Sequence, residues 1–266
     1  MLKVLVTGPR GFVGARIMEK LKTAQPCPSL RNATEDTVKR IVDTMQPDVI
    51  IHTSALSDIA SCERAPEASY RANVELPVWL AKTRVKLVAF STDQVYSACR
   101  EEGPYPEEMT APGNLYARHK LEMEEKTLAV NPGTVLLRAT WMYDMPVYGV
   151  ENRGNFLVNM LRGGAQSYSS VQHRGLTYVR EVAEMVRAAM QLPGGVYNFG
   201  SDHDLTMLET ARWLKEELGL PVELTDAGER HHLWMDCKKA RDHGICFHST
   251  IDGLRQCISD YGLRGD

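Results

Sequence analysis

The chain has 266 residues, of which 43% are hydrophobic and 24% charged, and its formal net charge is −3. This charge excludes a strongly basic nucleic-acid surface, and no apolar run approaches the about 20 residues of a membrane span. We therefore expect neither nucleic acid nor a membrane as a partner. The length suits one large domain, or a nucleotide-binding domain with a smaller second one. The six cysteines are scattered without a C-x-x-C pair, which predicts reduced thiols in a cytoplasmic protein.

Strands and helices alternate along the first half of the chain. Apolar patterning predicts strands at 3–7, 48–52, 86–91 and 134–138, and helices at 13–22, 34–45, 67–82 and 115–130. The segment 24–32 carries two prolines, so the second strand expected there is degenerate. Alternating strands and helices imply βαβ units and a parallel sheet.

The pattern becomes less regular from about residue 145. We expect helices near 155–162, 179–190, 207–218 and 251–261, with short strands near 195–198 and 222–224. The predicted fold class is α/β: a Rossmann-type doubly wound parallel sheet with a smaller C-terminal α/β substrate domain. We assign residues 1–144 to the Rossmann domain, with 174–193 returning to it, and residues 145–173 and 194–266 to the smaller domain.

A glycine-rich turn joins the first strand to the first helix. The run T-G-P-R-G-F-V-G, at 7–14, places three glycines three residues apart. In a dinucleotide-binding turn the first glycine permits the tight bend, the second lets a pyrophosphate approach, and the third lets the helix pack on the sheet. The helix N-terminus supplies N–H groups to the phosphates. The turn residues expected to bind the cofactor are Gly8, Arg10, Gly11, Phe12, Val13 and Gly14.

The residues after this turn favour NADP(H) as the cofactor. NAD-binding turns usually have an acidic residue about 20 positions later for the ribose hydroxyl. Here no carboxylate lies between Lys20 and Asn32, whereas Arg10 and Arg31 lie near the expected place. Guanidinium groups suit a 2′-phosphate. NAD(H) stays open, because both arginines could instead be solvated.

A tyrosine and a lysine open the helix at 115–130. Tyr116 and Lys120 are four residues apart and so share a helix face. A neighbouring ammonium favours phenolate and lowers the pKa of the phenol, which suits Tyr116 to acid/base chemistry. Thr92 follows a strand, at the sheet edge where open α/β folds build their sites, and its hydroxyl could orient a carbonyl toward Tyr116.

Several segments together resemble the extended short-chain dehydrogenase/reductases, and within them the dTDP-4-dehydrorhamnose reductases. The resemblance is good over residues 1–190 and weak beyond. It is carried by the glycine turn, P-D-V-I-I-H (47–52), F-S-T-D-Q-V-Y (90–96), A-P-G-N-L-Y-A-R-H-K (111–120), L-R-A-T-W-M-Y (137–143), G-N-F (154–156) and the Q-x-x-G-x-T run (172–177).

This resemblance implies roles for individual residues. Thr92, Tyr116 and Lys120 would be the catalytic trio, with Tyr116 protonating a sugar C4 oxygen and Lys120 holding the nicotinamide ribose. Further cofactor contacts would be Ser54, Ala55, Asn73, Ser91, Tyr116 and Lys120, with Asn73 also beside an active-site water. Substrate contacts would be Asp93, Gln94, Trp141 and Asn155. The chain departs from the pattern at Gln94, where an aromatic residue is usual, and in its truncated second strand.

These observations favour an NAD(P)H-dependent reductase of a nucleotide-linked 4-keto sugar. Two alternatives stay open. A nucleotide-sugar epimerase or dehydratase would use the same fold but hold NAD tightly. A non-catalytic regulatory relative, similar to the regulatory beta subunit of methionine adenosyltransferase, would serve a protein partner. A homodimer is also open, because helices flanking such sheets often pair. No metal is expected, since the His and Cys residues at 231–248 lack zinc-ligand spacing.

Overall fold

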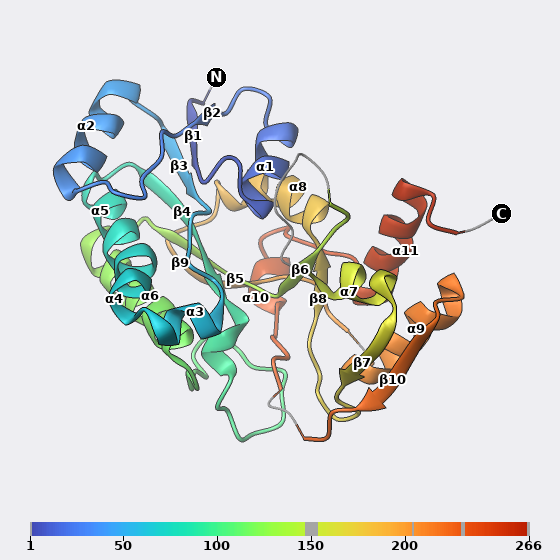
Figure 1. Cartoon of the computed structure of the whole chain (residues 1–266). Helices are drawn as coiled ribbons and strands as arrows, with labels where there is room; N and C mark the ends of the chain where they lie inside the picture. Colours follow the sequence, from blue (N-terminus) through green and yellow to red (C-terminus); the bar gives the residue numbers. More distant parts are fainter. Residues whose placement is uncertain (1, 147–153, 204, 230–231, 265–266) are drawn as a thin grey trace.

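A six-stranded parallel sheet forms the centre of the larger domain (Figure 1). The computed structural model describes residues 2–146, 154–203, 205–229 and 232–264. Every neighbouring pair of strands in this sheet is parallel, which confirms the predicted Rossmann-type fold. The strands, in spatial order, are β2 (Gln25–Pro26), β1 (Val4–Thr7), β3 (Val49–His52), β4 (Lys86–Thr92), β5 (Val135–Ala139) and β9 (Gly195–Phe199).

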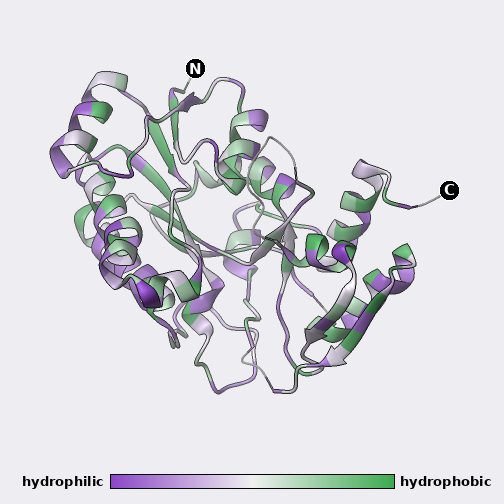
Figure 2. Cartoon of the chain, viewed as in Figure 1, coloured by the Kyte–Doolittle hydropathy of each residue, from purple (hydrophilic) through white to green (hydrophobic). Residues whose placement is uncertain are grey.

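Helices cover both faces of this sheet, because successive strand residues point to opposite sides. Val4 and Val6 pack toward α1 (Phe12–Lys20) and α8 (Val179–Ala189). Leu5 and Ile50 pack toward the other layer, where hydrophobic residues gather on the sheet side of the helices (Figure 2). That second layer consists of α2 (Glu35–Met45), α5 (Leu76–Lys82) and α6 (Leu115–Val130).

The helix predicted at 67–82 is interrupted. It consists of α4 (Pro66–Tyr70), a π-helical turn η1 (Arg71–Glu75) and α5, and the short helix α3 (Ile59–Arg64) precedes it. The wider turn places Asn73 with its side chain fully buried. Such turns are rare and often mark functional sites.

The smaller domain has its own apolar core, which includes Phe156, Leu176, Leu208 and Leu254. Two small sheets lie outside the large one in the described residues. Strand β7 (Gly164–Tyr168) pairs with β10 (Val222–Asp226), and β6 (Trp141–Tyr143) pairs with β8 (Leu176–Tyr178), two segments that the sequence assigned to the Rossmann domain. The helices around this core are α7 (Phe156–Arg162), α9 (Met207–Leu218) and α11 (Thr250–Tyr261).

The domain boundary expected near residue 194 is wrong for one segment. Strand β9 was assigned to the smaller domain, yet it is the sixth strand of the large sheet and pairs with β5 from Val135↔Gly195 to Ala139↔Phe199. The reason is burial: Tyr197 and Phe199 belong to the core beneath α8, which Ala240 of α10 (Lys238–Arg241) also joins. The remaining partition stays a prediction.

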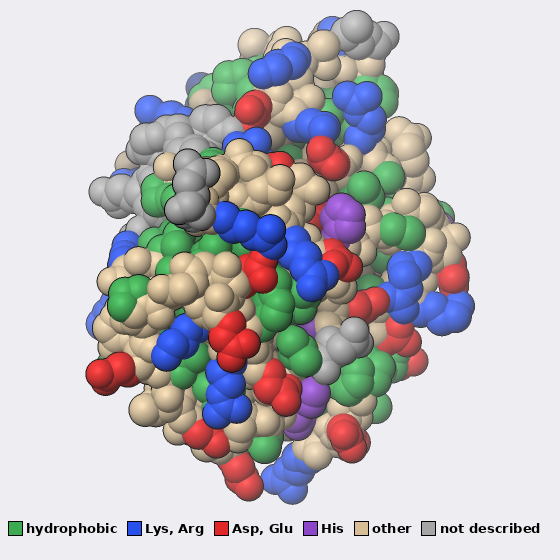
Figure 3. Space-filling view, turned by 90° about the vertical axis from the view of Figure 1, so that its right-hand side faces the viewer, with side chains coloured by type: hydrophobic (Ala, Val, Ile, Leu, Met, Phe, Trp, Pro, Cys, Tyr) green, Lys and Arg blue, Asp and Glu red, His purple; other side chains and the backbone are tan. Residues whose placement is uncertain are grey.

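The surface observations agree with the composition. Across the face formed by α9, β10 and α11, basic and acidic side chains are interspersed rather than gathered by sign (Figure 3). Among the described residues, no helix combines the length and apolar character needed to cross a bilayer.

Candidate active site

A cavity of about 960 Å³ opens at the carboxyl ends of β1, β3 and β4. Open α/β sheets bind their ligands at this edge. The cavity wall combines the glycine turn, the chain after β2, the loop after β3, the π-helical region and the start of α6. Of the predicted residues, those that line it are Gly8, Arg10, Gly11, Phe12, Val13, Arg31, Ser54, Ala55, Ser91, Tyr116 and Lys120.

The glycine turn has the geometry that close backbone approach requires. Gly8 has φ +63°, a conformation that favours glycine, and its carbonyl accepts from the Gly11 N–H at 2.9 Å. A Cβ on Gly14 would lie 2.1 Å from the Gly8 carbonyl oxygen, so only glycine lets α1 approach β1 this closely. Gly14 therefore lies behind the cavity wall, while Gly11 and Phe12 present the N-terminus of α1 to the cavity.

Two arginines border the part of the cavity next to β2. Arg10 and Arg31 are both exposed, and neither guanidinium is hydrogen-bonded or ion-paired within the described part of the chain. Sequence analysis missed a third, Arg71, which also lines the cavity and stacks over Trp79 at 5.4 Å. Arg71 lies at helical spacing from Ala68 and Trp79, which also line the cavity, and this spacing was the feature of the sequence that could have pointed to it.

Tyr116 and Lys120 point into the cavity from the first turns of α6. The Asn114 side chain caps this helix by accepting from the Ala117 N–H at 2.9 Å. Lys120 Nζ donates to the Phe90 carbonyl at 2.6 Å. Burial lowers the pKa of the Lys120 ammonium to about 8, and the Glu124 carboxylate opposes this shift. The predicted common face of the tyrosine and lysine is therefore present.

Burial raises the pKa of the Tyr116 phenol above its usual value, although a hydrogen bond with Thr92 opposes the rise. The prediction that Lys120 lowers this pKa is wrong, because desolvation dominates and the lowering contribution comes from Thr92. A phenol in this environment is protonated at neutral pH and can act as a proton donor. Thr92 is buried behind it, where its Oγ1 accepts from the Gln94 N–H at 3.2 Å.

Asn73 lies behind the cavity wall rather than in it. Its Oδ1 accepts from the Leu56 N–H at 3.2 Å, and its Nδ2 donates to the Leu56 carbonyl at 2.9 Å and to Ser69 Oγ at 3.2 Å. Leu56 itself lines the cavity. Asn73 therefore fixes the loop after β3, and the π-helical turn is what brings it there.

The four predicted substrate residues lie beside this cavity rather than in its lining. Asp93, the first residue of the 3-10 turn η2 (Asp93–Tyr96), forms a 2.9 Å ion pair with Arg174. Arg174 in turn stacks over Trp141 at 5.1 Å, so these three residues form one group next to Thr92. Sequence analysis did not select Arg174, although it lies in the Q-x-x-G-x-T run.

The other two predicted substrate residues have structural partners. Gln94 is buried and accepts from Asn114 Nδ2 at 3.2 Å. Asn155 is the N-cap of α7, where its Oδ1 accepts from the Val158 N–H at 3.1 Å and its Nδ2 donates to the Asp144 carbonyl at 2.7 Å. Both side chains are therefore committed to holding neighbouring segments.

Comparison with known proteins identifies the family. The family described as RmlD substrate binding domain matches residues 2–233. The chain belongs to this family. Among curated relatives, the methionine adenosyltransferase 2 subunit beta of Danio rerio is 28% identical over 93% of this chain and 87% of its own length. The dTDP-4-dehydrorhamnose reductase of Mycolicibacterium smegmatis is 30% identical over 53% of this chain and 46% of its own.

The fold of this RmlD-family chain is also that of a solved reductase. The dTDP-4-dehydrorhamnose reductase from Bacillus anthracis, solved in complex with NADP, superposes with a TM-score of 0.85 at 21% identity. The match covers 97% of this chain and 99% of that structure. At this identity the likeness establishes the fold alone.

Proposed function

We propose that this protein is an NADPH-dependent reductase of a nucleotide-linked 4-keto sugar. The observation that carries the proposal is that Tyr116 and Lys120 open into the same cavity as the glycine turn. A proton donor and a dinucleotide site thus share one wall. Membership of the RmlD family, whose relatives include a dTDP-4-dehydrorhamnose reductase, supports the sugar-nucleotide substrate class.

The residues present fit a dinucleotide. The N–H groups of Phe12 and Val13 at the start of α1 would hold the pyrophosphate, and the helix carries no acidic residue in its first turn to repel it. The guanidinium groups of Arg10 and Arg31, which have no partner among the described residues, would take the 2′-phosphate of NADP(H), and NAD(H) remains an acceptable second cofactor. When bound, the nicotinamide supplies the hydride.

The chain's own residues would bind and protonate the substrate. Tyr116, protonated because it is buried, would donate its proton to the carbonyl oxygen of the sugar, with Thr92 orienting the phenol. Lys120 would hold the nicotinamide ribose. We propose that Trp141 and Arg174 face the sugar nucleotide, with Asp93 fixing the guanidinium. Gln94 and Asn155 would support that wall from behind.

A second candidate function is that of a regulatory subunit without turnover. Two observations favour it: relatives that match nearly the whole chain include the methionine adenosyltransferase 2 subunit beta, and strand β2, which borders the expected adenosine end, is only two residues long. In that case the cavity would bind cofactor and the function would lie in a protein partner.

We also propose a cytoplasmic location, because all six cysteines are free thiols, which is the state that a reducing compartment maintains. A homodimer stays a prediction.

A two-step experiment separates these functions. Purified protein, stripped of nucleotide, is titrated with NADPH and NADH by fluorescence, and then supplied with dTDP-linked 4-keto sugar while nicotinamide absorbance is followed. The reductase proposal expects micromolar NADPH binding and turnover. Binding without turnover favours the regulatory candidate, and NAD that copurifies tightly favours an epimerase or dehydratase. The absence of binding at millimolar cofactor would overturn all three cofactor-dependent functions.

A further inference from the structure

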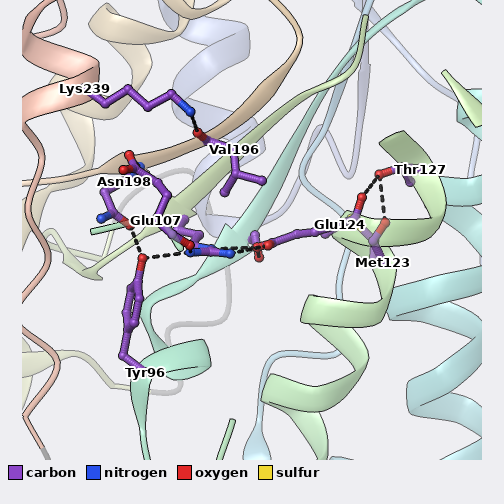
Figure 4. A network of polar contacts seen from close by, with 10 residues as sticks. Tyr96, Glu107, Met123, Glu124, Thr127, Val196, Asn198 and Lys239 are labelled. Atoms are coloured by element: carbon purple, nitrogen blue, oxygen red, sulfur yellow. Dashed lines mark hydrogen bonds and ion pairs between the residues drawn. The ribbon is translucent and has the colours of Figure 1, made fainter. Parts of the chain in front are cut away.

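A buried ion pair lies directly behind the candidate site. Glu124 on α6 and Arg138 on β5 are each about 3% exposed, and they form a two-point contact. Arg138 Nε donates to Glu124 Oε1 at 3.0 Å, and Arg138 Nη2 donates to Glu124 Oε2 at 2.6 Å. Figure 4 shows Glu124 among the polar contacts of this region, together with Tyr96, Glu107 and Asn198. The proposed reaction does not use either residue, and burying such a pair is costly.

Glu124 connects this network to the cavity. It lies four residues after Lys120, so the two side chains share one face of α6. Its Oε1 also accepts from Ser91 Oγ at 2.5 Å, and Ser91 both lines the cavity and directly precedes Thr92. One carboxylate thus holds the end of β4 against the helix that carries Tyr116.

Arg138 is held from the opposite side. Its Nη1 donates to Tyr96 Oη at 2.8 Å and to the Glu107 carbonyl at 2.6 Å, and Tyr96 donates to Asn198 Oδ1 at 2.7 Å (Figure 4). These contacts reach the loop before α6 and strand β9. These contacts hold the Arg138 guanidinium in place. The Glu124 carboxylate belongs to α6, the same helix that carries Lys120.

Glu124 contributes a carboxylate to the surroundings of Lys120, whereas the other titratable groups there are an imidazole, a thiol and a phenol. Burial lowers the pKa of His52 to about 3 and raises the pKa of the Cys62 thiol, so both are neutral at pH 7. Tyr116 is neutral for the same reason. Among the described residues, the titratable groups that interact electrostatically with Lys120 are His52 of β3, Cys62 of α3 and Glu124 of α6, while Tyr116 lies one helical turn before it.

We propose that Glu124 is a positioning residue of the active site: anchored by Arg138, it holds Ser91 and α6 together and keeps a negative charge one helical turn behind Lys120. This inference rests on the proposed function for its catalytic meaning. Its physical content, that Glu124 keeps the Lys120 ammonium charged, can be measured without turnover. Removing the carboxylate removes the larger of the two interactions that oppose desolvation, so the pKa of Lys120 should fall.

The test is a pH titration of ¹³C-lysine-labelled protein by NMR, without cofactor or substrate. The Lys120 signal is assigned by its loss in Lys120→Arg. In Glu124→Gln we expect the pKa of Lys120 to fall by about one unit. Glu125→Gln, the same substitution at the exposed neighbouring residue, is the matched control and should leave this pKa unchanged. Glu124→Asp keeps the negative charge but is too short for the Ser91 contact, so the pKa of Lys120 should stay close to its wild-type value.

A second variant covers the risk that Glu124→Gln fails to fold with Arg138 unpaired. Glu124→Gln/Arg138→Met removes both charges, and we expect the pKa of Lys120 to fall by about half a unit. An unchanged pKa in the folded variants would overturn the proposal.

If the protein turns over a keto sugar, the alkaline limb of its kcat/KM profile should move to lower pH by the same amount. A pKa shift without any turnover would instead count against the proposed reductase and leave the role of Glu124 standing.

Discussion

The proton donor of the proposed reaction can be tested at a single atom. Tyr116→Phe removes the phenol oxygen and retains the ring that packs in the wall of the cavity. We expect turnover to fall by about 10² or more, with NADPH affinity unchanged, because general acid catalysis contributes 10²–10⁴. Steady-state kinetics and a fluorescence titration measure both quantities. Tyr70→Phe is the control, since Tyr70 bonds Glu122 and Lys126 on the outer side of α6. Wild-type turnover in Tyr116→Phe would rule out the assigned role.

Cofactor preference is also decided by individual residues. Arg10 lines the cavity and is exposed, so Arg10→Ala should leave the fold intact and remove a charged donor for the 2′-phosphate. We expect NADPH to bind about tenfold more weakly and NADH to bind nearly as before, because a hydrogen bond to a charged group contributes about 1.5–3 kcal/mol. Paired titrations measure the ratio, and Arg40→Ala on α2 is the control. Equal losses for both cofactors would remove the argument for the phosphate.

Residue types and spacing predicted the wall of the cavity better than the residues behind it. The glycine turn, Tyr116 and Lys120 have local signatures, and they meet in one cavity. Asn73 and Asn155 have none, because their side chains are committed to backbone groups of Leu56 and Asp144, which depend on the tertiary fold. The Glu124–Arg138 pair was equally hidden, since it joins a helix to a strand.

At the scale of an element, the position of α1 depends on the absence of a side chain at Gly14. A Cβ there would lie 2.1 Å from the Gly8 carbonyl oxygen, so Gly14→Ala must push α1 away from β1. We expect a loss of about 1–3 kcal/mol in the free energy of unfolding, together with weaker cofactor binding. Urea denaturation and titration with NADPH measure these. Gly11→Ala, whose Cβ would lie 3.2 Å from the same oxygen, should cost less. Equal stability of Gly14→Ala and wild type would contradict this account of the turn.

The elements that sequence predicted are those with a strong period. The amphipathic helices α2 and α8 and the buried strands β3 and β4 were placed within a few residues. Strand β7, G-A-Q-S-Y, is mostly exposed and has no alternation, so nothing local distinguishes it from a loop. The π-helical turn was not predicted for a related reason, because the extra residue in its turn changes no local propensity. Its consequence, the burial of Asn73, is a property of the tertiary structure.

At the scale of the molecule, the pattern of apolar residues did not predict which of the two domains each strand after residue 194 would join. Strand β9 returns to the large sheet after a helix that also packs there, and its apolar residues would suit either core. What joins the domains is a buried polar hub at Asp144. Its Oδ2 accepts from Arg16 Nε of α1 at 2.7 Å, and its Oδ1 accepts from Tyr261 Oη of α11 at 2.8 Å.

This hub predicts that the two domains lose stability together. Asp144→Asn preserves the shape of the side chain but removes the buried carboxylate that accepts from Arg16 Nε and from Tyr261 Oη. We expect the free energy of unfolding to fall by about 3–5 kcal/mol, which is the usual cost of removing one partner of a buried ion pair. Urea denaturation followed by the combined fluorescence of the four tryptophans measures it, and a single transition is expected because Trp79 lies in the larger domain and Trp213 of α9 in the smaller. Asp43→Asn, which breaks an exposed pair with Lys39, should change stability by less than about 1 kcal/mol. If Asp144→Asn is no more damaging than Asp43→Asn, the hub does not couple the domains.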